Sequence, residues 1–285
     1  MRGDTARCGC LAVLTVAKIA GSGAAAYGQY LEGRTQAAEA GDYYLSQSGE
    51  RVEAPGRWAL GAQGAETLGV DAARSVGAEQ FRALMAVQNP ATGERLRAGG
   101  AGGTAVAAID ATFSAPKSVS VVWALASPEL RAGIEAAQER AVDAALAHAT
   151  EFVPMVRRRV DRETVLRETP AELLATSWRH TTARAVAGRA PDPQLHSYVV
   201  LHGAVRAGDG KVVAIESRAW LVHQREVGAA YRAQLAGELG ELGFGIETAT
   251  GRGGRYFELA GVPQGSWSSG QGVTARSGPR STSGS

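Results

Sequence analysis

The sequence predicts an α+β fold with a central antiparallel β-sheet flanked by helices. Three observations support this fold class. They are short β-branched runs, turn residues spaced to join such runs as hairpins, and two long segments with helical periodicity. Because hairpins and long helices are mixed along the chain, an antiparallel sheet is favoured over a doubly wound parallel sheet. The 285 residues, 45% of them hydrophobic, suffice for one large domain or two small ones.

The first expected elements are a strand and a helix that carries tyrosines. Residues 14–19 are rich in β-branched side chains, which favours a strand. After a turn, we expect a helix on which Tyr27 and Tyr30, three residues apart, share one face. Tyr43 and Tyr44 follow as a pair, and residues 49–58 are expected to form a loop.

The middle of the chain predicts a short helix and two strands. Apolar residues between 81 and 85 mark the helix, which Pro90 is expected to end. Residues 104–109 and 118–125 are expected strands, separated by a kink at Ser114-Ala-Pro-Lys117.

The second half predicts two long helices and several hairpin strands. Ser127-Pro128 is a good helix start, and the apolar stripe after it has helical spacing, so this helix should cover one face of the sheet. A second long helix is expected over residues 221–242, closed by Gly243. Strands are expected at residues 153–160, 164–168, 211–215, 245–248 and 256–259. Two further strands are expected around His180 and His196.

Composition and charge exclude several classes of protein. The formal net charge of +2 does not indicate a nucleic-acid binder, although Arg157-Arg158-Arg159 offers a local basic patch. Cys8 and Cys10 are too close for an ordinary disulfide, which is consistent with a cytoplasmic protein. No segment approaches the ~18 apolar residues of a membrane span, so no membrane partner is expected. Residues 264–285 are of low complexity and are expected to be disordered.

A segment with two histidines suggests a metal site. Because side chains alternate across a strand, His196, Tyr198 and His202 share one face. A hairpin through residues 186–193 would bring His180 towards His196, although a lone histidine is more often structural. His202 lies roughly 20 Å along the strand from His196, at ~3.3 Å per residue, and is therefore excluded. His148 and His223 are expected on helix surfaces.

Three other groups are candidates for chemistry. Ser114 and Lys117 could present a hydroxyl and an ammonium group to a phosphate, whereas the alternative is a simple kinked connection. Asp110 lies in an otherwise apolar strand, where a carboxylate is costly unless it is paired or used. It is a candidate base, with a cap or salt bridge as the alternative. A tyrosine nucleophile would need such a carboxylate or a metal, because its pKa is about 10.

Several motifs occur in an order that is typical of one family. They are Leu14-Thr-Val-Ala-Lys18, the tyrosine cluster, Gly49-Glu50 to Gly56-Arg-Trp58, Asp110-Ala-Thr-Phe-Ser-Ala-Pro-Lys-Ser-Val-Ser120, Arg179-His180 and Asp192-Pro-Gln-Leu-His196. With them the chain resembles the TrwC/TraI-type conjugative relaxases of the MobF family, members of the HUH endonuclease superfamily. The resemblance covers about residues 14–263, which would form the relaxase domain.

The resemblance implies a DNA strand transferase that nicks single-stranded DNA at a plasmid transfer origin and forms a 5′-phosphotyrosine. Tyr27 matches the first nucleophile with Tyr30 beside it, Tyr43 and Tyr44 match the second tyrosine pair, and Asp110 matches the assisting acidic residue. His180 and His196 match two ligands of a divalent metal, Mg²⁺ or Mn²⁺. Accessory conjugation proteins are further expected partners.

The chain departs from the family pattern at Tyr198 and at its ends. Tyr198 stands where the family has a third histidine, and a neutral phenol is a poor ligand for Mg²⁺ or Mn²⁺. Weaker metal binding and nicking are therefore expected. Residues 1–13 resemble an appended leader or a start assigned too far upstream, and the change at about residue 264 suggests a truncation or frameshift.

Two alternatives to a working nickase follow from the sequence. One is a degenerate relaxase that binds single-stranded DNA through its sheet, Lys117 and Arg157 to Arg159 but no longer cuts it. The other is a small-molecule metalloenzyme built on the two histidines, which leaves the tyrosines and the Ser-Ala-Pro-Lys segment without a role.

Overall fold

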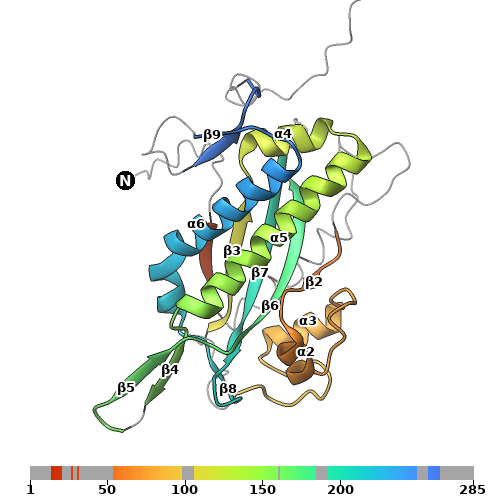
Figure 1. Cartoon of the computed structure of the whole chain (residues 1–285). Coiled ribbons are helices and arrows are strands. Elements are labelled where there is room, and N and C mark those ends of the chain that lie inside the picture. Colours follow the sequence, from red (N-terminus) through yellow and green to blue (C-terminus); the bar gives the residue numbers. More distant parts are fainter. Residues whose placement is uncertain are drawn as a thin grey trace, which may run out of the picture.

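The centre of the molecule is an antiparallel sheet. The computed structural model describes residues 14–20, 27, 31, 54–97, 106–159, 161–183, 192–248 and 256–263. The sheet has six strands in the order β1-β3-β7-β6-β2, with β8 paired to β7. They are β1 (Leu14–Ala20), β2 (Arg57–Trp58), β3 (Val106–Ser114), β6 (Glu172–Thr182), β7 (Pro193–Arg206) and β8 (Val212–Ala214). The predicted α+β class is confirmed (Figure 1).

Two long helices cover one face of the sheet. Helices α5 (Pro128–Phe152) and α6 (Ser217–Glu241) lie side by side across it (Figure 1). Ser127 caps α5 by accepting a hydrogen bond from the Leu130 amide, as the sequence predicts. The helices and the sheet share the main hydrophobic core, in which Ile134, Phe113 and Tyr231 are fully buried.

The opposite face is covered at one end by two short helices, α2 (Ala62–Leu68) and α3 (Ala78–Met85). Phe81 of α3 packs edge-on against Trp178 of β6, with ring centroids 4.6 Å apart. Helix α2 was not predicted. Helix α3 lies where a short helix was expected, but Pro90 does not end it. It ends at Met85, and Val87 then takes a left-handed conformation (φ 57°) that turns the chain away.

The predicted strand at residues 118–125 is wrong, because this segment is helix α4 (Lys117–Leu125). The β-branched and aromatic residues that favour a strand are instead packed between β7, α5 and a hairpin, so tertiary contacts override local propensity. Burial on several sides also removes the amphipathic pattern that would have indicated a helix. Strand β3 extends further than expected, through the Asp110 motif to Ser114.

Two hairpins complete the described fold. Strands β4 (Val156–Arg159) and β5 (Val165–Glu168) form a ribbon that projects from the body, and β9 (Ile246–Thr248) pairs with β10 (Phe257–Leu259). Both pairs were predicted. In the part of the chain that the structure describes, no helix is long and apolar enough to cross a membrane. The predicted leader (1–13) and tail (264–285) lie outside the described residues.

Candidate active site

Three aromatic rings from two adjacent strands meet on the sheet face that α5 and α6 leave uncovered. In the β6–β7 pair His180 lies directly opposite His196, as the predicted hairpin requires. Their ring centroids are 5.5 Å apart, and the ring of Tyr198 lies 4.9 Å from each. His180 is fully buried and His196 nearly so. The three rings therefore form a compact triangle.

The donor chemistry of the two histidines fits a divalent metal. The Nδ1 atom of His196 lies 2.8 Å from the carbonyl oxygen of Gln194. Because a carbonyl can only accept, Nδ1 carries the proton, and Nε2 of the neutral ring holds the lone pair that a metal needs. Two imidazoles that bind one ion through nitrogens about 2.1 Å away have centroids roughly 5 Å apart, close to the spacing observed here.

Tyr198 occupies the third corner of this triangle. Within the described residues, no group of three His, Cys, Asp or Glu side chains is arranged to hold a metal ion. A metal bound here would take two imidazoles from the protein and the rest of its ligands from water, DNA or a weak phenol contact.

A tyrosine and a carboxylate lie one strand further along the same face. Asp110 of β3 is half-buried; desolvation raises the pKa of its carboxyl group, and the nearby hydroxyl groups of Tyr27 and Thr112 partly offset that shift. The Thr112 hydroxyl donates to Asp110 over 3.1 Å. Thr112 is also directly opposite Tyr198 in the β3–β7 pair. Asp110 and Thr112 thus lie on the same sheet face as the ring triangle, with Tyr27 close to Asp110.

Sequence analysis did not identify Thr112 as part of this site. A signal was present, because Thr112 is two residues beyond Asp110 in a strand and therefore shares its face. Tyr30, Tyr43 and Tyr44, the other tyrosine candidates, lie outside the described residues.

The remaining histidines are separate from this site, as predicted. His202 is fully buried, and its Nε2 lies 3.0 Å from the Thr176 hydroxyl. Burial lowers the pKa of His202 to about 3, so its ring is neutral. His148 and His223, on α5 and α6, both contact the carboxylate of Glu226 at the helix surface.

The Ser-Ala-Pro-Lys segment has a different role from a kink between strands. Ser114 ends β3, opposite His196, and α4 begins at Lys117. The Lys117 ammonium group donates to the carbonyl of Pro193, 2.8 Å away. Ser120 is buried, and its hydroxyl accepts from the Leu195 amide. The segment holds the start of β7, the strand that carries His196, and only Ser114 adjoins the ring triangle.

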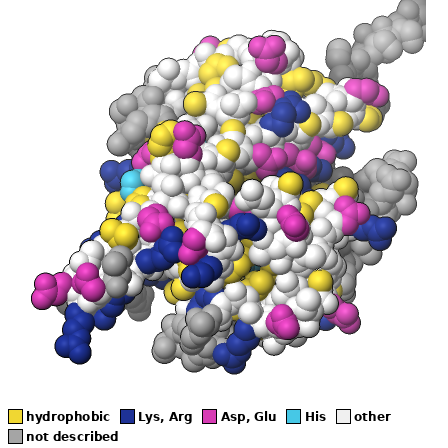
Figure 2. Space-filling model, turned by 60° about the horizontal axis from the view of Figure 1, so that its bottom comes forward, with side chains coloured by type: hydrophobic (Ala, Val, Ile, Leu, Met, Phe, Trp, Pro, Cys, Tyr) yellow, Lys and Arg dark blue, Asp and Glu magenta, His cyan; other side chains and the backbone are white. Residues whose placement is uncertain are grey.

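The arginine run is split between the two faces of the β4–β5 ribbon. Arg158 is bound by Glu168 and Asp209, at 3.1 and 2.7 Å. Arg157 and Arg159 point to the other face and are exposed, and Arg157 lies opposite Arg167. Elsewhere, basic and acidic side chains are interspersed over the face shown in Figure 2. On the strands of the ribbon, the exposed basic residues are therefore Arg157, Arg159 and Arg167, and Arg162 is exposed in the turn between them.

The chain is an antiparallel α+β domain with two histidines paired on neighbouring strands, and comparisons with known proteins assign its class. A family model described as TrwC relaxase matches residues 24–269, and the chain belongs to this family. The predicted resemblance is confirmed.

Solved structures show the same likeness. A conjugative relaxase TrwC in complex with mutant OriT DNA is 27% identical, with a TM-score of 0.66 over 89% of this chain and 76% of that one. A metal-bound TrwC complex with OriT DNA is 26% identical, with a TM-score of 0.67 over 89% of this chain and 77% of that one. A copper-bound TrwC complex is 28% identical, with a TM-score of 0.67 over 87% of this chain and 76% of that one. No curated protein matches the chain.

Proposed function

We propose that this relaxase nicks single-stranded DNA at a transfer origin through Tyr27. The Tyr27 oxygen attacks the phosphorus, the bond from phosphorus to the 3′ oxygen breaks, and the products are a 5′-phosphotyrosine and a 3′-hydroxyl. The phenol proton passes to Asp110, and the departing 3′ oxygen takes up a proton. The position of the Tyr27 hydroxyl near the Asp110 carboxylate, on the sheet face that carries the paired histidines, is the observation that supports this proposal.

The surroundings of Asp110 suit it to act as the base. A phenol with a pKa of about 10 transfers its proton poorly to an ordinary carboxylate, because the pKa of the carboxyl group is much lower. Burial raises the pKa of Asp110 and so reduces the difference between the two pKa values. Thr112 holds the carboxylate in place from the same strand.

His180 and His196 would hold the divalent metal, Mg²⁺ or Mn²⁺ in our proposal. Such an ion would polarise an oxygen of the scissile phosphate as a Lewis acid. Related structures described as metal-bound and copper-bound TrwC support a metal at this kind of site. Within the protein, the contact of His196 Nδ1 with the Gln194 carbonyl would leave Nε2 of that ring to face the metal.

DNA would reach the site across the uncovered sheet face. Thr15 and Ala17 of β1 are exposed there, next to the Asp110 segment of β3 in the sheet. Ser114 would contact the DNA backbone near His196, whereas Lys117 would act chiefly by holding the start of β7 in place. Arg157 and Arg159, with Arg167, would contact phosphates outside the active site. TrwC complexed with a 27-mer that comprises a recognition hairpin and cleavage site supports this class of partner.

A DNA-binding remnant without nicking activity is the second candidate, because Tyr198 replaces a possible metal ligand. The decisive experiment incubates the protein with single-stranded oligonucleotides that carry the transfer origin. We expect a covalent protein–DNA adduct on a denaturing gel with Mn²⁺ or Mg²⁺, and its loss with chelator. A mobility shift without any adduct would instead identify the remnant.

The pH dependence of adduct formation should report on Asp110. A base works only when deprotonated, so the rate should fall as the pH drops through the raised pKa of Asp110. That loss should occur at higher pH than for an ordinary aspartate, whose pKa is about 3.9. In Asp110→Asn the rate of adduct formation should fall by a factor of ~10²–10⁴, and the decrease of the rate at low pH should disappear.

Repeating the pH profile at several Mn²⁺ concentrations distinguishes protonation of Asp110 from protonation of the histidines as the cause of the fall in rate at low pH. A limb that shifts when Mn²⁺ is varied belongs to metal release, whereas the Asp110 limb should stay in place. A pH profile that is unchanged in Asp110→Asn would remove Asp110 from the mechanism.

A further inference from the structure

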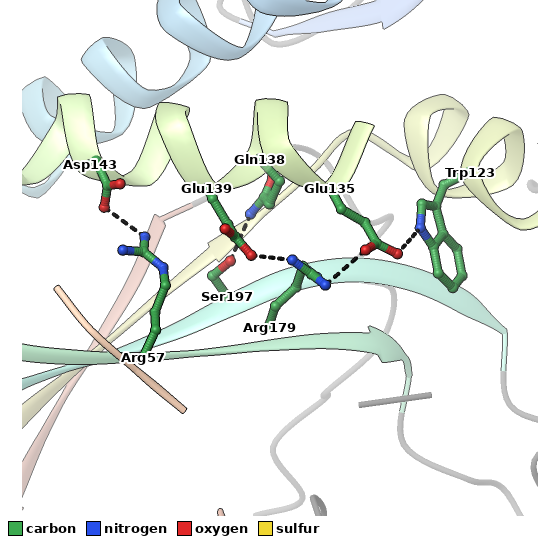
Figure 3. Close-up of polar contacts among 8 residues, drawn as sticks. All are labelled: Arg57, Trp123, Glu135, Gln138, Glu139, Asp143, Arg179 and Ser197. Carbon is green, nitrogen blue, oxygen red and sulfur yellow. Dashed lines mark hydrogen bonds and ion pairs between the residues drawn. The ribbon is translucent and has the colours of Figure 1, made fainter. Parts of the chain in front are cut away.

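One turn of α5 contacts the back of all three strands that carry the site. Glu135, Gln138 and Glu139 are spaced i, i+3 and i+4, so they share one helix face. Glu135 and Glu139 both bind the guanidinium of Arg179 on β6, the former at 2.8 Å. Gln138 donates to the Ser197 hydroxyl of β7 at 3.1 Å and to the Phe113 carbonyl of β3 at 3.2 Å. Figure 3 shows Arg179 and Ser197 directed towards this turn.

The strand residues held by α5 are sequence neighbours of the site residues. Arg179 precedes His180, and Ser197 lies between His196 and Tyr198. Because successive side chains point to opposite faces of a sheet, fixing these residues from behind also fixes the rings in front.

His180 needs such support because β6 is weakly held at this point. Among the described residues, β2 pairs with β6 only at Thr176 and Ser177, so beyond them β7 is the sole strand neighbour. The β6–β7 register also shifts between His180 and Thr182. A guanidinium held by two carboxylates resists rotation and sliding, because its donors form a planar fork.

The Gln138 side of the turn is buried and fully bonded. Its carbonyl oxygen accepts from the Tyr231 hydroxyl at 2.7 Å, and its amide nitrogen makes the two donations described above. Burial raises the pKa of Tyr231, which keeps this phenol a donor. On the other side, the Trp123 indole donates to Glu135 at 2.9 Å. The polar atoms of Gln138 are thus all bonded, and losing one of its partners would leave a buried polar group unpaired.

We infer that the Glu135–Arg179–Glu139 clamp positions His180 for metal binding, with Gln138 doing the same for the His196 strand. Arg179 is thus a positioning residue that acts through His180. This inference rests on the proposed metal site. It predicts that breaking the clamp weakens metal binding more than it weakens the fold or DNA binding.

The test measures Mn²⁺ binding to the whole chain by calorimetry, without DNA. Arg179→Met should raise the Mn²⁺ dissociation constant by ~10-fold or more, as losses of groups that orient metal ligands do. The affinity for a single-stranded oligonucleotide in chelator should stay unchanged. Arg179→Lys keeps the charge but not the fork, and should give an intermediate value.

Arg57→Met is the matched control. Arg57 of β2 pairs with Asp143, which lies on α5 like the clamp residues (Figure 3). Arg57 is not adjacent in sequence to either histidine and is not part of the clamp. This substitution removes a single, more exposed ion pair to the same helix and should leave Mn²⁺ binding unchanged. If Arg179→Met does not fold, Glu139→Gln removes one charge from a partly exposed position and should weaken Mn²⁺ binding in the same direction, by less.

The outcomes separate the inference from the proposed function. Wild-type protein that binds no Mn²⁺ would overturn both. Wild-type protein that binds Mn²⁺ together with an unaffected Arg179→Met, or with an equal loss in Arg57→Met, would overturn the clamp alone.

Discussion

Tyr27→Phe is expected to abolish the covalent adduct between the protein and a cleaved transfer-origin oligonucleotide. The change removes only the oxygen that would attack the phosphate, which lies near Asp110. Binding of the uncut oligonucleotide should be retained, because the ring still packs against the cluster of Ile19, Phe81 and Trp178. The measurement is adduct yield on a denaturing gel beside a mobility shift with the same oligonucleotide.

Tyr256→Phe provides the control for this substitution. Tyr256 lies beside β10, where its ring faces the Arg232 guanidinium at 5.3 Å, remote from Asp110 in the fold. It should form the adduct at the wild-type rate. Full adduct in Tyr27→Phe, with loss in Tyr30→Phe instead, would transfer the role of first nucleophile to Tyr30.

Tyr198→His is expected to tighten Mn²⁺ binding and speed nicking by ~10–100-fold. The Tyr198 ring already lies 4.9 Å from both histidine rings, so an imidazole there would add a third nitrogen ligand. Tyr198 is only partly buried, and the smaller ring should be accommodated without repacking the core. Calorimetry with Mn²⁺ and single-turnover cleavage of the oligonucleotide measure the two effects.

Tyr198→Phe tests whether the phenol oxygen already contributes. It keeps the ring and its packing, so metal affinity should match that of the wild type. Weaker binding in Tyr198→Phe would show that the phenol is a ligand, and wild-type nicking at or above the rate of Tyr198→His would refute the expected impairment.

Local sequence patterns predicted most of the fold. The N-cap and apolar stripe of α5, the Gly243 end of α6, the β-branched run of β1 and the alternating side chains of β7 each indicate an element through its own residues. Helix α4 was mispredicted because its valines favour a strand, and only contacts with β7, α5 and β10 make it a helix. Helix α2 was missed because its short segment, Ala-Gln-Gly-Ala-Glu-Thr-Leu, has little apolar periodicity.

By itself, the sequence determined the family, the antiparallel α+β class, and the candidate tyrosine, aspartate and histidines, because these follow from motifs and from strand periodicity. Only the tertiary structure decided which of them meet. It paired His180 with His196, joined Tyr27 and Thr112 to Asp110, and assigned Arg158 to an ion-pair network while Arg157 and Arg159 stayed exposed. It also placed the carboxylates of α5 behind the paired histidines. Such contacts depend on strand register and helix docking, which join residues far apart in the chain and leave no local pattern in it.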